Sequence, residues 1–488
     1  MGNRNQSVFF MSDLLATAAV FYYEVSRECH WEKGILMIRF GIKHSPLRFI
    51  HSALVGLFIL VLSGCQNMAF FPDFNETSPP QEIDKQKQVQ VKAKSIEAHQ
   101  FQLVEDQTLV GNLATVETQE NDTLSDIARH FGLGYNDISR ANPTIAAWTP
   151  QVGSHVVLPL QFILPVTAHK GIVLNLANMR LFYYPKQQSH TVLTYPVGIG
   201  RQGWNTPLGL TSIVAKTANP TWTVPESIHQ EHQQKGDPLP TVVAAGPNNP
   251  LGLYAMRLGF PHYLIHGTNK PYGIGMQISH GCVQMYPEDI EVLFTNASID
   301  MPVKIIHQPY LVGWKQDNLY LEANEPLQKW QNEKASLKKK LLKQIKKLSV
   351  AKHVSVDWAR VDEVIQKSDG IPTPILLESS DEADMITHAI QLEHPAQLYQ
   401  QPIVEELTDN DWSILVASFD NEQKAQELAT MLNHQGPMIP SRKIQKANGY
   451  QVIAGPFKNK KEVNVIAKRI RMDFELEVKP IKPNTVLN

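Results

Sequence analysis

Cys282 and two nearby histidines are the residues of this sequence best suited to nucleophilic chemistry. His266 stands sixteen positions before the cysteine, in YLIHGTN, and His280 stands two positions before it, in SHGC. A free thiol with a pKa of about 8.5 is mostly protonated at neutral pH, so it needs a base that takes its proton. An imidazole within hydrogen-bond reach is such a base. The alternative is that Cys282 is a small, buried and inert side chain.

The residues that flank the cysteine predict how it is presented. Gly281 allows tight backbone geometry immediately before the nucleophile. The N–H groups of Gly281 and Cys282 can then point at a developing oxyanion. A strand that ends at Ile265 would carry His266 at its tip, and the GTNKPYGIGMQI connection can return the chain so that the cysteine faces it.

The length, composition and net charge of the chain indicate the broad class of protein. A length of 488 residues suggests about three domains, and an apolar fraction of 43% is ordinary for globular protein. A net charge of -2 gives no indication of a nucleic-acid partner. The histidines lack metal-ligand spacing, so neither a metal site nor a cofactor is predicted.

An export signal is expected near the N-terminus. Residues 53–62 form an apolar run that is too short to cross a bilayer and typical of a signal-peptide core, and Arg39, Lys43 and Arg48 precede it. The LSGC that ends at Cys65 resembles the bacterial lipobox, whose cysteine is acylated and becomes the mature N-terminus. The alternatives are an ordinary membrane anchor and a buried helix with an incidental cysteine.

Lipidation of Cys65 would leave one free thiol. Cys29 would be removed with the signal segment, so Cys282 could not form an intramolecular disulfide. Counting from Met37 gives a signal segment of ordinary length, and Met37 is therefore the expected true start. Gln66 follows the lipobox, and by resemblance to lipoprotein sorting rules the absence of aspartate there favours the outer membrane.

Residues 112–160 predict a β-α-α-β unit. Asp122 is expected to cap a helix that carries three apolar residues on one face. These residues are Leu124, Ile127 and Ala128. The DTL, ANP and VVLP segments resemble the LysM module, which binds glycans that contain N-acetylglucosamine, such as peptidoglycan. The alternative is a small two-helix domain with no particular function.

The last 80 or so residues contain a near-repeat. WSILVASF (412–419) is echoed by YQVIAGPF (450–457), and an amphipathic helical stretch follows each. With a short strand near SRKIQKA and a closing ELEVKPI, the order is β-α-β-β-α-β. GYQVIAGPF resembles SPOR domains, which bind peptidoglycan glycan strands stripped of stem peptides. The alternative is a ferredoxin-like domain with another partner.

Residues 167–309 predict a mostly β domain, because IVLNLANMRLFYYP, TVLTYPVGIG and TSIVAKTA are strand-like runs between turn signals. The IHGTN and SHGCVQM motifs resemble the L,D-transpeptidase catalytic domain, the YkuD-like family. NTPLGLTSI, NPTWTVPESI and LPTVVAAGPNNPLGLYAM resemble its periplasmic branch, which carries LysM in front of the catalytic domain.

The resemblance implies roles for the motif residues. Cys282 attacks the carbonyl of the third residue, normally diaminopimelate, of a tetrapeptide stem, and D-alanine leaves to give a thioester. His266 acts as general base, oriented by the backbone carbonyl of Gly267. His280, Gly281 and the Cys282 N–H shape the oxyanion site.

Four further residues are expected at or beside the substrate. Ser279 is implied to hold the loop by hydrogen bonding. Thr268 and Tyr254 are expected to contact the substrate, with a place in the core or the cleft wall as the alternative for Tyr254. Gln284 stands where the family usually has arginine or asparagine, and it lacks the charge and planar fork of arginine. It either changes the donor or acceptor preference or keeps enough hydrogen bonding for the same reaction.

The expected fold is multidomain: a mostly-β L,D-transpeptidase catalytic domain, a βααβ LysM module and an α+β ferredoxin-like SPOR domain. An extension with a basic helix at 325–348 links the catalytic domain to the SPOR-like domain, and this helix is expected to be solvated, with attraction to an anionic surface as the alternative. The expected boundaries are 1–65 (signal and lipoprotein segment), 66–111 (polar tether), 112–160 (LysM), 167–309 (catalytic domain), 310–408 (extension, ending in an acidic linker from 353) and 409–482 (SPOR-like domain).

The implied function is peptidoglycan L,D-transpeptidation. The acyl group would pass to an amine of a second diaminopimelate, giving a 3→3 cross-link, or to a lysine of an outer-membrane lipoprotein. The alternatives are an L,D-carboxypeptidase or a lipoprotein–wall amidase that uses the same cysteine, and a non-enzymatic scaffold that binds the wall. The expected location is the periplasm of a Gram-negative bacterium, with a lipid anchor in the outer membrane.

Overall fold

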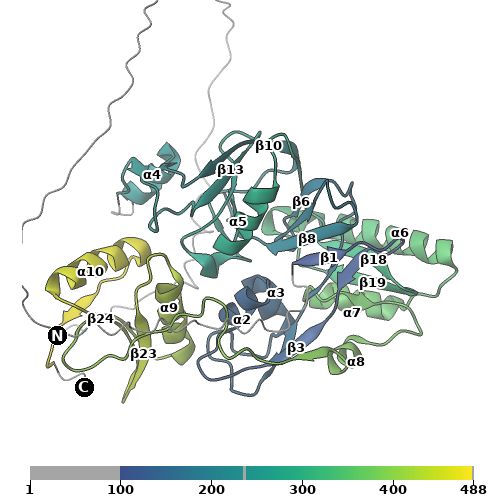
Figure 1. Cartoon of the computed structure of the whole chain (residues 1–488). Helices are drawn as coiled ribbons and strands as arrows, with labels where there is room; N and C mark the ends of the chain where they lie inside the picture. Colours follow the sequence, from purple (N-terminus) through teal and green to yellow (C-terminus); the bar gives the residue numbers. More distant parts are fainter. Residues whose placement is uncertain (1–98, 235–237, 486–488) are drawn as a thin grey trace, which may run out of the picture. The chain divides into compact units, whose positions relative to one another are not determined.

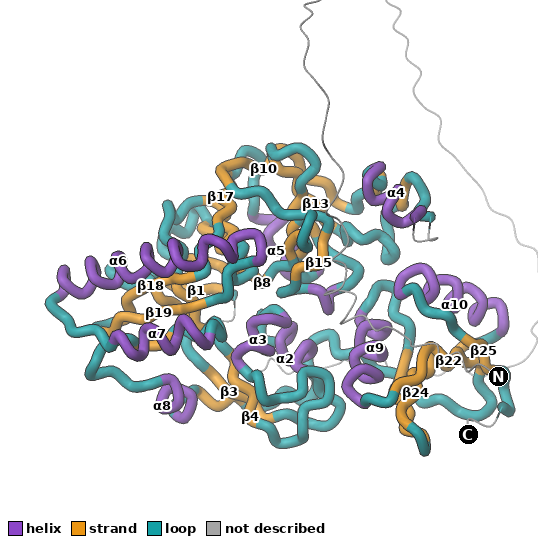
Figure 2. Tube along the Cα trace, turned by 180° about the vertical axis from the view of Figure 1, so that it is seen from behind, coloured by secondary structure: helices purple, strands orange, loops and turns teal. Residues whose placement is uncertain are grey.

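The computed structural model of this chain describes residues 99–234 and 238–485 (Figures 1 and 2). The expected signal segment, its lipidation site Cys65 and most of the expected tether lie outside the described residues. Within the described part of the chain, no helix combines the length and the apolar character that a membrane span requires.

The catalytic region is built on a nine-stranded sheet. Its strands, in the order in which they lie side by side, are β1 (Gln100–Gln102), β8 (Thr191–Pro196), β7 (Arg180–Tyr184), β6 (Gly171–Asn175), β17 (Pro302–Ile306), β10 (Gly209–Ala218), β13 (Tyr254–Leu258), β14 (Leu264–His266) and β16 (Val283–Gln284). Two neighbouring pairs, β17 with β6 and β14 with β16, are parallel. The prediction of a mostly β catalytic domain is confirmed.

The LysM module consists of two short helices and a strand pair. Its elements are β3 (Ala114–Glu117), α2 (Leu124–His130), α3 (Tyr135–Ala141) and β4 (His155–Leu158), with β3 and β4 antiparallel. The expected apolar face of α2 is buried, but the expected cap is wrong. Thr123 caps the helix by accepting a hydrogen bond from the Asp126 N–H at 3.1 Å. The Asp122 carboxylate instead accepts from the Gln119 N–H at 2.7 Å, because it lies one residue too early.

Alternate residues of β6 and β7 enter two different cores. Ile172 and Leu181 belong to the core of the catalytic region, where they share a cluster with Leu293 of α5 (Pro287–Asn296). Val173 and Phe182 face the other side and share a cluster with residues of the LysM helices. Strand side chains alternate between the two faces of a sheet, so burial of both sets means that the sheet is covered on both faces.

The expected polar tether is wrong over its last residues. β1 pairs with β8 at the edge of the large sheet, and Phe101 is buried in the core shared with LysM. β2 (Leu109–Gly111) pairs with β5 (Gln161–Ile163). The apolar side chains at 101, 109 and 110 are buried by contacts that form only in the folded chain. The polar composition of the segment therefore does not indicate these strands.

The extension is folded, so the expected linker from 353 onward is also wrong. β18 (Tyr310–Lys315), β19 (Asn318–Ala323) and β20 (Thr373–Pro374) form a sheet, and α6 (Lys334–Lys352) and α7 (Trp358–Lys367) pack on it. The chain continues through α8 (Glu382–Thr387) to β21 (Ile390–Leu392), which adds a parallel strand to β3 of LysM. An apolar stripe on α7 is buried in the structure, although the acidic composition of this segment does not indicate it. The stripe consists of Val361, Val364 and Ile365.

The basic helix predicted at 325–348 exists as α6, preceded by a 3-10 turn at Gln328–Glu333. Leu341 and Ile345 are buried against the β18–β19 sheet. The opposite side exposes five lysines to solvent, as a solvated helix should. They are Lys339, Lys340, Lys343, Lys346 and Lys347.

The C-terminal domain has the predicted β-α-β-β-α-β order. Its elements are β22 (Trp412–Phe419), α9 (Glu422–His434), β23 (Ser441–Lys446), β24 (Gly449–Phe457), α10 (Lys460–Phe474) and β25 (Lys479–Ile481). The sheet order is β23-β24-β22-β25, with every neighbouring pair antiparallel.

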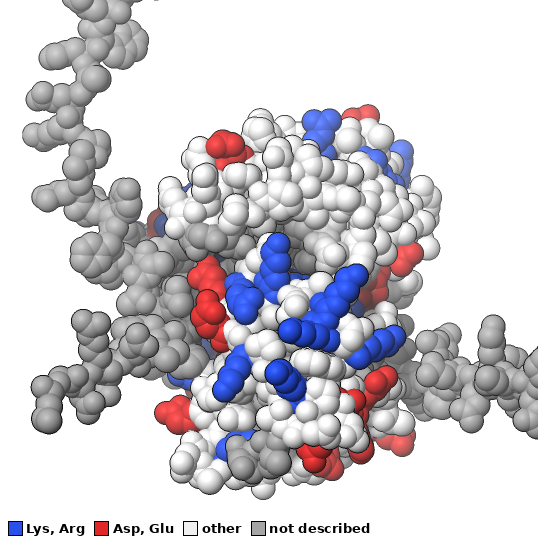
Figure 3. Space-filling view, turned by 90° about the vertical axis from the view of Figure 1, so that its left-hand side faces the viewer, with Lys and Arg blue, Asp and Glu red and all other residues white. Residues whose placement is uncertain are grey.

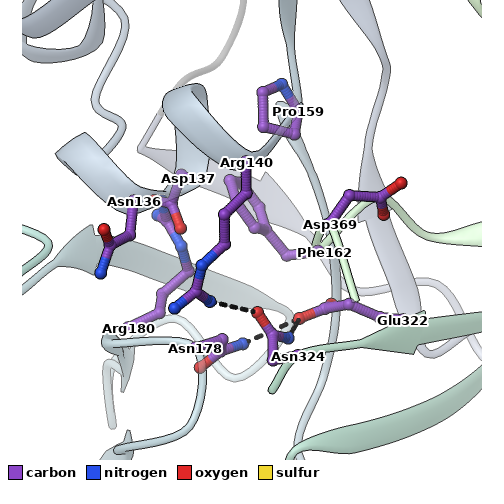
Figure 4. Close-up of a pocket in the computed structure, with 11 residues that line it drawn as sticks. Asn136, Asp137, Arg140, Pro159, Phe162, Asn178, Arg180, Glu322, Asn324 and Asp369 are labelled. Atoms are coloured by element: carbon purple, nitrogen blue, oxygen red, sulfur yellow. Dashed lines mark hydrogen bonds and ion pairs between the residues drawn. The ribbon is translucent and has the colours of Figure 1, made fainter. Parts of the chain in front are cut away.

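A buried polar cluster joins LysM, the catalytic sheet and the extension (Figure 4). Arg180 is 1% exposed and donates to Asp137 of α3 at 2.7 Å. The Glu322 carboxylate of β19 accepts from Asn178 at 3.0 Å and from Asn324 at 3.1 Å. Burial nevertheless raises the pKa of Glu322 to about 7, so this acid titrates near neutral pH.

Charged side chains are unevenly distributed over the surface. Figure 3 shows one face on which Lys and Arg side chains gather across the middle, with Asp and Glu mainly toward its edges.

Candidate active site

Two strands present the predicted nucleophile and base. β14 and β16 pair in parallel, with Ile265 opposite Val283 and His266 opposite Gln284. Ile265 and Val283 point into the catalytic core, where they are 0% and 1% exposed. Because side chains alternate along a strand, the face opposite Ile265 and Val283 carries His266 and Gln284, and Cys282 lies immediately before Val283. His266 and Cys282 are sixteen residues apart in the sequence. In the structure, His266 ends β14 and Cys282 directly precedes the neighbouring strand β16.

The Cys282 thiol is half-buried and lies at the rim of the sheet. It donates a weak hydrogen bond to the His262 carbonyl at 3.8 Å. Burial raises the pKa of the thiol, and a backbone hydrogen bond with Leu264 partly opposes this. The sulfur is not sealed in a dry core, and in the free protein it is held as a thiol.

His266 is 3% exposed and its ring is fixed by the backbone. Its Nδ1 lies 2.6 Å from the Gly267 carbonyl oxygen, which can only accept, so Nδ1 carries the ring proton. Burial lowers the pKa of His266 to about 4, against the opposing effect of the Gly267 and Leu251 carbonyls. The imidazole is therefore neutral at pH 7, and Nε2 has the lone pair that a general base needs.

These pKa directions define the resting state of the pair. A lowered imidazole pKa and a raised thiol pKa both disfavour a thiolate–imidazolium pair in the free protein. Within the described residues, the hydrogen bond of the thiol goes to His262 rather than to His266. Both groups are accordingly uncharged in the free protein.

Ser279 organises the loop before the nucleophile. Its hydroxyl donates to the Cys282 carbonyl at 2.6 Å and accepts from the Gly281 N–H at 3.2 Å. Thr206 donates to the Gly281 carbonyl at 2.8 Å from the other side. The expectation that the Gly281 N–H points at an oxyanion is not met, because Ser279 already takes that N–H. The Cys282 N–H is the remaining backbone candidate for this role.

Gly281 has a φ of 102°, a conformation that favours glycine. A Cβ at this position would lie 2.9 Å from the Tyr263 ring, so the site excludes a side chain on steric grounds as well. The predicted tight geometry before the cysteine is thus present in the structure.

The His280 imidazole lies in a charged cluster. Its Nε2 lies 2.9 Å from Arg201 Nη2 and 3.1 Å from Glu231 Oε2. Arg201 Nη2 also lies 2.6 Å from both Glu231 oxygens, and Trp204 packs edge-on against the imidazole at 4.9 Å. Sequence reasoning missed this cluster, since Arg201 and Glu231 lie 79 and 49 residues before His280 and carry no local motif.

The expected substrate-contacting residues differ in their surroundings. Gln284 is half-buried and exchanges backbone hydrogen bonds with Gly198 at 2.9 Å. The Thr268 side chain is 5% exposed and accepts from the Lys270 N–H at 2.9 Å. Tyr254 lies 4.8 Å from Phe294 between ring centroids and donates to Glu291 at 3.2 Å, which places it on the wall beside α5. Among the described residues, no cluster of three or more metal-ligating side chains occurs.

Comparison with protein families identifies three modules. Residues 169–305 match the L,D-transpeptidase catalytic domain, residues 116–159 match the LysM domain and residues 408–475 match the SPOR domain. These matches confirm the three resemblances inferred from the sequence and the multidomain fold class.

Several curated relatives are similar over most of their own length. The probable L,D-transpeptidase YbiS of Escherichia coli K12 is 38% identical over 271 residues, which is 54% of this chain and 87% of the relative. The probable L,D-transpeptidase ErfK/SrfK of Salmonella typhimurium LT2 is 39% identical over 272 residues, 55% of this chain and 87% of the relative. The probable L,D-transpeptidase YcfS of Escherichia coli K12 is 40% identical over 215 residues, 43% of this chain and 67% of the relative. This chain therefore belongs to the L,D-transpeptidase family.

Proposed function

We propose that this protein is a peptidoglycan L,D-transpeptidase with Cys282 as nucleophile and His266 as general base. The observation that carries the assignment is the parallel pairing of β14, which ends at His266, with β16, which begins one residue after Cys282. A neutral imidazole that is protonated at Nδ1 and a partly exposed thiol fit the chemistry of acyl transfer through a thioester.

The first half of the reaction forms the thioester. Sγ of Cys282 attacks the carbonyl carbon of the third stem residue while the thiol proton passes to Nε2 of His266. The tetrahedral oxyanion accepts a hydrogen bond from the Cys282 N–H. The bond to the terminal D-alanine then breaks, and the leaving amine takes the proton from His266.

The second half transfers the acyl group. An acceptor amine attacks the thioester carbonyl and gives a proton to His266. The C–S bond breaks, the new amide leaves and the thiol is regenerated with that proton. The acceptor is an amine of a second diaminopimelate or of a lipoprotein lysine, and water in its place would make the enzyme a carboxypeptidase. Attack of Cys282 on the amide between the wall and a lipoprotein lysine would release the lysine amine, and hydrolysis of the resulting thioester would make the enzyme a lipoprotein–wall amidase.

The two binding modules increase the supply of substrate. LysM and SPOR domains suggest peptidoglycan binding, and two weak glycan binders on one chain raise the effective concentration of stem peptides near Cys282. We place the protein in the periplasm, with Cys65 acylated and anchored in the outer membrane. Metabolic labelling with a palmitate analogue tests the anchor, because label that persists in Cys65→Ala contradicts it.

One experiment separates the functions. The purified protein and its Cys282→Ala variant are incubated with tetrapeptide muropeptides, and products and intact protein are analysed by mass spectrometry. Cross-linked dimers together with a thioester adduct on the wild type support transpeptidation. Tripeptide monomers alone support hydrolysis. An identical product profile for both proteins leaves a wall-binding scaffold and overturns the proposal. Matching thermal unfolding of the two proteins shows that the variant is folded.

A further inference from the structure

The charged cluster on His280 makes conflicting demands on one ring nitrogen. Arg201 carries only N–H donors, whereas the ionised Glu231 carboxylate can only accept. Both lie within hydrogen-bond distance of Nε2, at 2.9 and 3.1 Å. Nε2 must be unprotonated to accept from Arg201 and protonated to donate to Glu231. The balance between these two partners therefore decides where His280 holds its proton.

The cluster is also tied to the nucleophile loop through the backbone. The Arg201 N–H donates to the Ser279 carbonyl at 2.8 Å, so the same residue that contacts the imidazole anchors the residue before it. Arg201 follows β9 (Ile199–Gly200), which pairs with β15 (Gln277–Ser279). Glu231 comes from α4 (Glu226–Gln234), in the segment that joins β10 to β13. Three separate stretches of chain thus meet at the residue two positions before Cys282.

We propose that Arg201 and Glu231 are positioning residues that set the protonation of His280 and thereby the charge beside the nucleophile loop. Neither residue is assigned a contact with substrate. The inference rests on the proposed role of Cys282 as nucleophile, because that role makes the charge beside this loop relevant to the reaction.

The surroundings favour a neutral His280. Burial lowers the pKa of this imidazole first, and the charge of Arg201 and that of His232 lower it further. Glu231 raises it by hydrogen bonding and by its charge. Arg201 and His280 in turn bring the pKa of Glu231 to about 2, against the effect of burial, so the carboxylate stays ionised throughout the working range. Trp204 adds an apolar ring edge and no further charge.

Opposite changes are expected from removing the two partners. In Arg201→Gln the cationic donor is lost, Nε2 donates to Glu231, and the pKa of His280 rises. In Glu231→Gln the anionic acceptor is lost, Nε2 accepts from Arg201, and the pKa falls. The titration of His280 should therefore move in opposite directions in the two variants.

The test uses the full chain with histidines labelled at the ring positions, and the His280 signal is assigned with His280→Gln. Its titration is followed by NMR in the wild type and in both variants. We expect the pKa of His280 to rise by at least about half a unit in Arg201→Gln and to fall by at least about half a unit in Glu231→Gln, which corresponds to about a threefold change in its protonation equilibrium in each direction. Lys443→Gln, in an ion pair of the C-terminal domain at 2.6 Å, is the matched control and should leave the titration of His280 unchanged.

The sign of the two shifts decides the outcome. Shifts in the same direction in both variants, or no shift in either, overturn the proposal, because general loosening of the loop would act alike in both. The titration of His280 requires no acyl acceptor. A protein that forms no thioester but shows opposite shifts would therefore contradict the proposed function and leave this inference standing.

Discussion

His266 and Gln284 lie directly opposite each other in the parallel pair of β14 and β16. The residue at which this chain departs from the usual arginine or asparagine of its family thus shares a face with the proposed base and lies next to the strand end that carries Cys282. Within the described residues, Gln284 Oε1 is buried without a hydrogen-bond partner. A buried, unpaired acceptor is unfavourable for folding, and a donor on a substrate reaches it only if the side chain moves.

Replacing Gln284 separates these two effects. Gln284→Met keeps the size of the side chain and removes the unpaired oxygen, so the free energy of unfolding should rise by about 1 kcal/mol. If the oxygen accepts a hydrogen bond from the stem peptide, kcat/KM should fall at the same time by about tenfold. Denaturant unfolding and steady-state kinetics measure the two quantities. A variant that is both less stable and fully active contradicts the interpretation.

The pH dependence of acylation should report the buried imidazole. Burial brings the pKa of His266 to about 4, so the base stays neutral down to about pH 5 and is lost only as the pH falls through 4. As the pH is lowered, the rate of thioester formation should therefore stay constant to well below pH 6.5, the ordinary pKa of histidine. Single-turnover acylation followed by intact-protein mass spectrometry measures this limb.

The control for this profile is His266→Ala. This substitution should lower the acylation rate by about 100-fold or more, as expected for loss of a general base. The decrease of the rate at acidic pH should also disappear from its pH profile. An acidic midpoint of 6 to 7 in the wild type would show that the imidazole is more solvated in solution than in the structure.

Two glycines with similar backbones provide a matched test of the nucleophile loop. Gly281 has a φ of 102° and an ideal Cβ would meet the Tyr263 ring at 2.9 Å, whereas Gly153 has a φ of 80° with no atom within 4 Å. Both alanine variants bear the strain of a left-handed backbone, about 1–2 kcal/mol. Only Gly281→Ala should also displace the loop and lower alkylation of Cys282 by tenfold or more.

Alkylation with iodoacetamide and thermal unfolding compare these two variants. Equal alkylation of Gly153→Ala and Gly281→Ala would mean that the contact with Tyr263 relaxes without moving the nucleophile.

The buried acid in the polar cluster should make stability depend on pH. In the folded protein the pKa of Glu322 is about 7, above the ordinary value of 4.5, so the folded state binds more protons than the unfolded state between these pH values. Stability from this residue is fully present below pH 4.5 and is lost as the pH rises through 7, by about 3 kcal/mol in total.

Glu322→Gln removes this ionisation. The difference in melting temperature, variant minus wild type, should therefore increase from pH 5 to pH 8, whatever its value at pH 5. Calorimetry at several pH values measures it, and Glu333→Gln on the exposed surface is the control. A difference that stays constant with pH would show that Glu322 remains ionised in the folded protein.

Much of the site could be predicted because its motif is contiguous. SHGC places Ser279, His280 and Gly281 next to Cys282 by covalent connection alone, and IHGTN carries the base with the carbonyl that orients it. The strand and helix order of the C-terminal domain could likewise be predicted, since alternating and helical periodicity are properties of short segments.

Composition was a poor guide wherever burial depended on a distant partner. The composition of residues 99–111 predicts a tether and that of the segment from 353 predicts a linker. In the structure, β1 pairs with β8 and β21 pairs with β3. A few apolar residues in a polar stretch are enough to form a strand when an exposed sheet edge is within reach. No local pattern contains that information.

The sequence by itself determined the family and the module order, and it led to Cys282 and His266 as the proposed nucleophile and base. Only the tertiary structure decided that the thiol and imidazole rest uncharged, since this depends on how deeply each is buried. It also decided that Ser279 takes the Gly281 N–H and that Arg201 and Glu231 meet at His280. The physical reason is that hydrogen bonds and desolvation act through space, over contacts that chain folding creates between residues far apart in the sequence.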